Sequence, residues 1–139
     1  MYNKNSKVSK LLYYFLFFLL YIPYKHITGV EIHPEAKIGE GLFIPHCTSI
    51  IISKSAVIGN EATIHQCTTI GLNYKTNKAP ILGDNVFIGT NSSIVGGINI
   101  GDNVKVLPNS TVTKDFSKDL IIGGVPAKII KENNILKDL

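Results

Sequence analysis

The chain has 139 residues, of which 45% are hydrophobic and 17% charged, and its formal net charge is +4. This length leaves room for one domain, and the apolar content is that of a globular rather than a disordered chain. The basic residues are spread along the chain and are not interleaved with aromatic residues, which argues against nucleic acid as a partner.

An apolar segment comes first in the chain. Residues 11–22 (LLYYFLFFLLYI) form an unbroken apolar run, preceded by Lys7 and Lys10 and closed by Pro23. A membrane-spanning helix needs about 20 such residues, so this run is too short to cross alone, and no small-residue cleavage site follows it. Two interpretations fit residues 1–28: a helix in the membrane interface, or a helix packed against other subunits of an oligomer.

Aliphatic residues then recur at every sixth position. The series is Ile32, Ile38, Ile44, Ile52, Ile58, Ile64, Ile70, Leu82, Ile88, Ile94, Ile100, Val106 and Val112. A period of six is neither helical nor simple alternation, but it fits a short strand and a sharp turn repeated three times per coil. Successive coils would stack about 4.8 Å apart with their strands paired in parallel. The pattern predicts an all-β domain, a parallel β-helix over residues 29–130.

The repeat is interrupted twice. The step from Ile44 to Ile52 is eight residues, so two extra residues should bulge out just after His46. The step from Ile70 to Leu82 is twelve, and the segment between them predicts an external loop, where solenoids often carry function. Beyond the β-helix, residues 131–139 are assigned as a C-terminal tail, and the charged stretch 129–139 predicts a short capping helix.

His46 is the candidate catalytic base, because an imidazole can accept a hydroxyl proton near neutral pH and this one sits at the bulge. Glu31 precedes it by 15 residues, one coil less three, which places its carboxylate near the same corner. A carboxylate there would orient the imidazole and stabilise its protonated form. The sequence therefore predicts a Glu31–His46 dyad and leaves the roles of His33 and His65 open.

Cys47 and Cys67 are the two cysteines of the chain, and we expect them to stack on neighbouring coils. Their spacing is not that of a metal site, so no metal is expected. Two small side chains in a column of turns are more typical than a nucleophile, although Cys47 adjoins His46.

From Gly29 to Ile130 the chain resembles the serine acetyltransferase branch of the hexapeptide transferases. The segments that carry the resemblance are GVEIHPEAKIGEGLFIPH, AVIGNEATIHQCTTIG, ILGDNVFIGTNSSIVGGINIGDNVKV and GVPAKII. The resemblance implies a left-handed β-helix, a homotrimer and acetyl-CoA as co-substrate. The family's base falls on His46 and its acidic partner on Glu31. Coenzyme A bound between subunits would be contacted by the residues matching Gly71, Thr90, Lys105 and Lys128, the last near the phosphates.

Two departures concern the acceptor. Pro45 stands where serine acetyltransferases have an aspartate, and Lys78–Ala79 stand where they have an arginine–histidine pair. Those family residues hold the charged ends of the amino acid, so their replacement favours another hydroxyl.

With its short apolar N-terminal segment, the chain is similar to acetyltransferases that modify sugar hydroxyls in surface-polysaccharide synthesis. The acceptors of those enzymes are often lipid-linked. We expect an O-acetyltransferase acting on a saccharide hydroxyl in the cytoplasm, associated with the inner face of the cytoplasmic membrane through residues 11–22. Serine O-acetylation is the alternative enzyme activity, and a non-catalytic trimeric scaffold is the alternative of another class.

Overall fold

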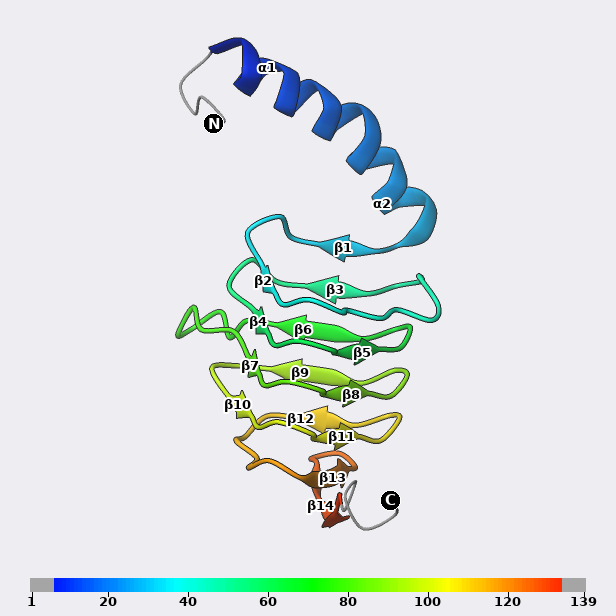
Figure 1. Ribbon diagram of the computed structural model, residues 1–139, viewed down its shortest axis with the longest axis vertical. Helices are drawn as coiled ribbons and strands as arrows, with labels where there is room; N and C mark the ends of the chain where they lie inside the picture. The colour runs from blue at the N-terminus through cyan, green and yellow to red at the C-terminus, as the bar shows by residue number, and fades with distance from the viewer. Residues whose placement is uncertain (1–6, 134–139) are drawn as a thin grey trace.

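A single helical rod leads into a stack of β-coils in the computed structural model, which describes residues 7–133 (Figure 1). The rod comprises α1 (Lys7–Leu16), a π-helical turn η1 (Phe17–Tyr21) and α2 (Ile22–Thr28). Gly29 ends it with a φ of 67°, and the Gly29 N–H donates a hydrogen bond to the carbonyl of Lys25 at 2.8 Å. A left-handed glycine with this bond is a common helix stop, because few other residues adopt that φ without strain.

The helix continues through Pro23, the residue that follows the apolar run in the sequence. Pro23 lies in the first turn of α2, directly after the π-helical turn. Proline lacks an N–H donor, and it is tolerated where the local hydrogen-bond pattern leaves that position without a partner. The result is a helix over Ser9–Thr28 of 20 residues, which by length and composition alone could cross a membrane.

The β-helix is built from very short strands that form three sheets along its axis, and all of them run parallel except the last, which is antiparallel. The first sheet contains β1 (Glu31–Ile32), β3 (Ile51–Ile52), β6 (Thr69–Gly71), β9 (Ser93–Val95) and β12 (Thr111–Val112). The second contains β2 (Lys37–Ile38), β4 (Val57–Ile58), β7 (Ile81–Leu82) and β10 (Asn99–Ile100). The third contains β5 (Thr63–Ile64), β8 (Phe87–Ile88), β11 (Lys105–Val106), β13 (Leu120–Gly123) and β14 (Lys128–Glu132).

The aliphatic series forms columns inside the coils, as the six-residue period predicts. Ile52 pairs with Ile70 and Ile70 with Ile94 in the first sheet, while Ile64 pairs with Ile88 in the third. These side chains are at most 1% exposed. Each coil therefore buries three aliphatic side chains against the coils above and below, and this packing is the main stabilising contribution.

The corners between sheets need left-handed backbone or very small residues. Asn85, Asn91, Asn103 and Asn109 all have φ near +55°, and their side chains bond between coils, Asn85 to Asn103 and Asn91 to Asn109. Asparagine tolerates this conformation because its short amide can bond locally. At Gly59, a Cβ would lie 2.5 Å from backbone atoms of Gly83, so only glycine fits there.

The first interruption of the repeat lies where the sequence places it, but its detail differs from expectation. Phe43 pairs with Thr63, whereas beyond the bulge Ile51 pairs with Thr69. The Cys67 N–H donates to the carbonyl of Thr48, which aligns Cys67 with Ser49 rather than with Cys47. The expected stacking of the two cysteines is therefore wrong, because the extra residues are accommodated before Ser49 and the register has already reset there.

The second interruption is an external loop over residues 72–80, as predicted. Asn73 and Lys78 form an antiparallel bridge across it, and the Asn77 N–H donates to the carbonyl of Asn73. The Asn73 side chain also accepts bonds from the N–H groups of Lys75 and Thr76. The loop is thus a hydrogen-bonded hairpin that projects sideways from the β-helix between β6 and β7 (Figure 1).

The C-terminal cap is a strand, not the predicted helix, over Ile129–Glu132. β14 runs antiparallel to β13 and covers the edge of the third sheet. An open sheet edge offers unpaired N–H and C=O groups, and pairing with it outweighs the local helix preference of a short charged stretch. The rest of the expected helix, residues 134–139, lies outside the described part of the chain.

Candidate active site

His46 lies at the corner between the third and first sheets, just after the bridge at Phe43. Its side chain is exposed, and its carbonyl accepts a hydrogen bond from the Thr48 N–H at 2.9 Å, which closes a tight turn within the bulge. The two extra residues interrupt the regular pairing at this corner. They leave an imidazole facing solvent, where it can meet a substrate.

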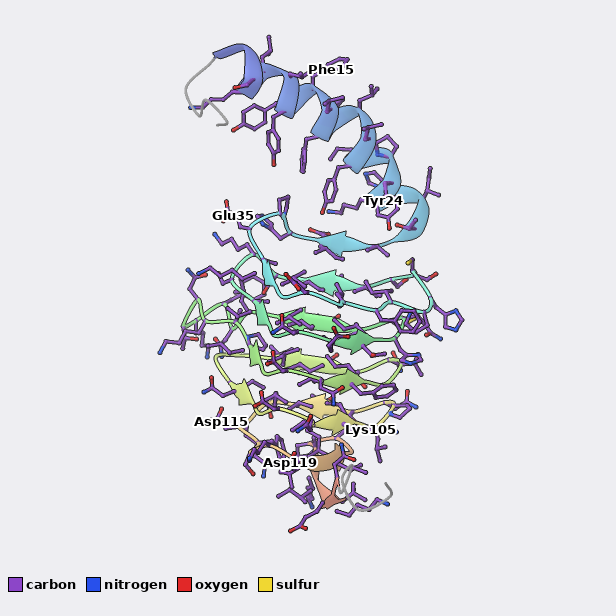
Figure 2. The ribbon with its side chains drawn as sticks, in the orientation of Figure 1. Phe15, Tyr24, Glu35, Lys105, Asp115 and Asp119 are labelled. Atoms are coloured by element: carbon purple, nitrogen blue, oxygen red, sulfur yellow. The ribbon has the colours of Figure 1, made fainter. Side chains whose placement is uncertain are left out.

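A row of side chains continues from His46 along the outside of the third sheet. The His46 and His65 rings are 6.4 Å apart between centroids, and the His65 and Phe87 rings are 5.0 Å apart. Lys105, labelled in Figure 2, holds its ammonium 5.0 Å from the centroid of the Phe87 ring. Because these residues come from successive coils, the row runs parallel to the axis of the β-helix and ends in a positive charge.

Glu31, the predicted partner of His46, begins β1 and pairs in register with Ile51, five residues after His46. It therefore lies on the strand that leaves the His46 corner, one coil earlier. Its carboxylate is engaged by the α2 side chain of Lys25, with Nζ 2.6 Å from Oε2. Among the described residues no hydrogen bond joins Glu31 to the His46 ring, so the dyad stays a prediction.

The Lys25–Glu31 contact has electrostatic consequences at the helix junction. The hydrogen bond that the Lys25 ammonium donates to the Glu31 carboxylate raises the pKa of Lys25 above its ordinary value of 10.5. Burial, reinforced by the Glu31 charge, raises the pKa of Tyr21 above 10.0, and the Tyr21 hydroxyl donates to the carbonyl of Ile32 at 3.2 Å. Sequence reasoning missed Lys25, because the direction in which the helix leaves the first coil is not encoded in the repeat.

The residues predicted to bind coenzyme A fall into two regions of one chain. Thr90, Lys105 and Lys128 belong to the third sheet or the corner that follows it, and Thr90 Oγ1 donates to the carbonyl of Gln66 at 3.1 Å. Gly71 instead ends β6, at the start of the external loop. A Cβ on Gly71 would find only ordinary contacts, 3.5 Å from Thr69 and 3.7 Å from Val95, so its surface is open.

The external loop forms one wall of a shallow pocket of about 410 Å³ over the second sheet. Polar groups from Ser55, Asn77, Lys78 and Asn99 line it, together with Ile81 and Ile98. Ala79, which also lines it, is only 8% exposed and packs into the core. The pocket thus offers one cation and several amide or hydroxyl groups, which suits a small charged molecule.

The remaining candidate residues are His33 and the two cysteines, and their surroundings do not indicate a catalytic role. His33 Nδ1 accepts a hydrogen bond from the Glu35 N–H at 3.2 Å, which stabilises the turn between β1 and β2. Cys47 and Cys67 are exposed free thiols. Within residues 7–133 no group of three or more His, Cys, Asp or Glu side chains is placed to hold a metal ion.

Comparison with known proteins gives a consistent picture. The family described as bacterial transferase hexapeptide (six repeats) matches residues 79–114. The serine acetyltransferase of Helicobacter pylori strain 26695 is 35% identical over 134 residues, which is 95% of this chain and 78% of that protein. The crystal structure of Neisseria gonorrhoeae serine acetyltransferase aligns with a TM-score of 0.75 and 38% identity, over 78% of this chain and 42% of that one.

Two further matches bear on length and on the co-substrate. The serine acetyltransferase of Synechococcus elongatus is 35% identical over 81% of this chain, which spans 47% of that protein. A solved serine acetyltransferase in complex with CoA aligns with a TM-score of 0.69 and 36% identity, over 73% of this chain and 42% of that one. The chain therefore spans about half the length of several relatives, and its fold is the predicted left-handed parallel β-helix.

The expected saccharide acceptor is contradicted by these four relatives and structures, each of which is a serine acetyltransferase. That expectation rested on Pro45, on Ala79 and on the apolar segment. Ala79 is buried in the core of this chain, so its small side chain answers a packing need and carries no information about a sugar. Local departures at two positions do not outweigh similarity along the whole β-helix.

Proposed function

Because the chain belongs to the serine acetyltransferase family of hexapeptide-repeat acyltransferases, we propose that it transfers an acetyl group from acetyl-CoA to the hydroxyl of L-serine. The observation that carries this proposal is the exposed His46 imidazole at the bulged corner, within a chain whose relatives share this reaction by name. An imidazole in contact with solvent can accept a proton from a bound hydroxyl near neutral pH.

In the proposed reaction His46 removes the hydroxyl proton while the serine oxygen attacks the thioester carbonyl. A C–O bond forms, the C–S bond breaks, and the proton passes from His46 to the departing thiolate of CoA. Glu31 is proposed to orient the imidazole, using the carboxylate oxygen that does not bind Lys25. A backbone N–H would stabilise the oxyanion, as in other acyl transfers.

The two candidate regions of a single chain suggest how the site is completed. His46, Thr90, Lys105 and Lys128 lie on the third sheet and its corner, whereas the loop pocket lies over the second sheet. We propose a homotrimer in which the corner of one subunit meets the loop of the next. Coenzyme A would then lie between subunits, with Gly71 giving close backbone access and the lysines facing its phosphates.

Lys78 is proposed to bind the carboxylate of serine. It is the cation of the loop pocket and stands beside Asn77 and Ser55. A single ammonium replaces the arginine expected from the family pattern, and it binds a carboxylate as a point charge rather than through two parallel bonds. This predicts weaker binding of serine without loss of the reaction.

We place the protein in the cytoplasm, next to the inner face of the membrane.

The test is a thiol-release assay with acetyl-CoA and L-serine, with L-alanine as the acceptor that lacks the hydroxyl. His46→Ala should lower the rate by about 10²–10⁴-fold, the usual range for loss of a general base. His26→Ala removes an exposed histidine of α2 and should change the rate less than twofold. Equal rates for wild type and His46→Ala, or no transfer to L-serine by the folded wild type, would contradict the proposal.

A further inference from the structure

Most apolar side chains of the helix over Ser9–Thr28 are exposed to solvent. Exposed fractions are 73% for Leu11, 61% for Phe15, 72% for Phe18 and 62% for Leu20. The helix rises from the first coil and stands clear of the β-helix, with Phe15 on the free part (Figure 2). This apolar surface needs a partner, because large exposed apolar patches are rare on soluble proteins.

The direction of the apolar side chains identifies the kind of partner. Residues 11–22 contain no charged side chain, and at 100° per residue they cover the whole circumference of the helix. A bundle of helices from three subunits would bury one stripe of each helix and leave its outer face in water. An all-round apolar helix instead fits a surrounding apolar medium, which is the acyl region of a lipid bilayer.

Along one side of the helix the aromatic side chains contact one another, and the side chains nearest the β-helix contact the first coil. Phe17 stacks on Tyr13 and Tyr21, with ring centroids 6.2 and 4.6 Å apart. Tyr21 and Lys25 then bond to the first coil, so they fix the helix to the β-helix at one end. This end contact holds the helix while leaving Leu11, Phe15 and Phe18 free to contact lipid.

The charge around the apolar run is of one sign. Residues 1–30 contain four lysines and no aspartate or glutamate, with Lys10 just before the run and Lys25 just after it. Basic residues beside an apolar helix attract anionic headgroups. Tyr13 and Tyr24, near the two ends of the run, have amphipathic rings of the kind that favour the headgroup level.

We propose that the helix over Ser9–Thr28 embeds in a bilayer that contains anionic lipids and thereby holds the β-helix at the membrane surface. Burial of the apolar side chains supplies most of the attraction, and the lysines add a preference for negative headgroups. This goes beyond the acyl-transfer reaction and does not depend on which hydroxyl is acetylated.

The experiment is flotation of the full chain with vesicles of phosphatidylcholine, or of phosphatidylcholine and phosphatidylglycerol at three to one. Wild type should float with both and partition several-fold more strongly onto the anionic vesicles. High salt should remove that preference while binding persists, because salt screens exposed charges and leaves apolar burial intact. Wild type that stays with the soluble fraction in both mixtures would overturn the proposal.

Matched variants localise the effect. The triple change Phe15→Ser, Phe18→Ser and Leu19→Ser should lower partitioning onto both vesicles more than tenfold. The control triple Val125→Ser, Ile129→Ser and Ile130→Ser removes equally exposed apolar side chains from the far end of the β-helix and should bind like wild type. Equal losses in the two triples would overturn the proposal, as would unchanged binding of the helix variant.

Oligomeric state and activity separate this inference from its alternatives. The helix triple should remain a folded oligomer of wild-type size in vesicle-free buffer and should acetylate soluble L-serine within twofold of wild type. Dissociation of this variant, together with a wild type that does not float, would assign the helix to a contact between subunits instead. Vesicle binding needs no substrate, so its failure and failure of the proposed reaction are distinct results.

Discussion

The helix and the β-helix both contain large apolar residues, but these side chains are exposed on the helix and buried in the β-helix. Ile64, Ile88 and Ile94 are completely buried in the coils, whereas Leu11 and Phe18 are more than 70% exposed on the helix. Spacing makes the difference. In the β-helix two positions of each six-residue repeat face the interior, the aliphatic one and the residue two before it, such as Ile88 and Val86, so the domain has an inside and an outside. Residues 11–22 of the helix form an unbroken apolar run, so this part of the helix has no side that suits water.

The comparison teaches that apolar content alone does not predict burial. A periodic apolar pattern specifies which face is covered by the same chain, and a continuous one requires something outside the chain. Three experiments would break or sharpen this contrast.

The largest expected effect is in the β-helix core. Ile94→Ala should lower the free energy of unfolding by about 2–5 kcal/mol, because it leaves a cavity between two coils. Phe18→Ala on the helix removes a larger side chain and should change it by less than about 0.5 kcal/mol, the usual limit for surface positions. Denaturant midpoints at one fixed protein concentration, in mild detergent, measure both. Similar losses in the two variants would mean that the helix packs into the folded domain.

A smaller effect should distinguish tight from open positions within the β-helix itself. Gly59→Ala places a methyl group 2.5 Å from the backbone of Gly83, so we expect a loss of about 1–3 kcal/mol as the coils shift. Gly71→Ala meets only ordinary contacts and should leave stability nearly unchanged.

The same denaturant titration checks the glycine pair, and the Michaelis constant for acetyl-CoA adds a second measurement. If Gly71 faces the cofactor as proposed, its alanine variant should raise this constant although it folds normally. Comparable loss of stability in both variants would contradict the difference in packing between the two positions.

The smallest effect concerns the junction between the two regions. The Lys25 and Glu31 side chains are 35% and 40% exposed, so their ion pair should stabilise the junction only slightly. The pKa of Lys25 is raised in the folded protein, so its contribution is complete below pH 10.5 and is lost as the pH rises through the folded value. The raised pKa of Tyr21 acts in the same direction, because the unfolded chain ionises first above pH 10.0.

Thermal melts of wild type and Lys25→Met should therefore differ by a small and constant amount between about pH 7 and 9. The difference should shrink above about pH 11. Lys10→Met is the control, because Lys10 has no carboxylate partner among the described residues. This variant should melt like wild type at every pH. A difference that grows with alkaline pH would mean that Lys25 is not stabilised by Glu31.

Much of the candidate site could be placed from the sequence because coil register is arithmetic. The repeat puts His46 at a corner and Glu31 one coil earlier, and the structure has both there. Register does not report which atoms touch. The bond from Lys25 to Glu31, the ring contacts of His65 and the realignment of Cys67 with Ser49 each depend on how the chain leaves a strand.

The sequence by itself determined the β-helix, since a six-residue period in aliphatic residues has few other solutions and every coil repeats the same short-range choice. It also determined the external loop, where the period is missing. Only the tertiary structure decided the contact of the helix with the first coil, the strand that covers the last sheet edge, and the two separate halves of the candidate site. Those features depend on contacts between segments far apart in the chain, which no local pattern specifies.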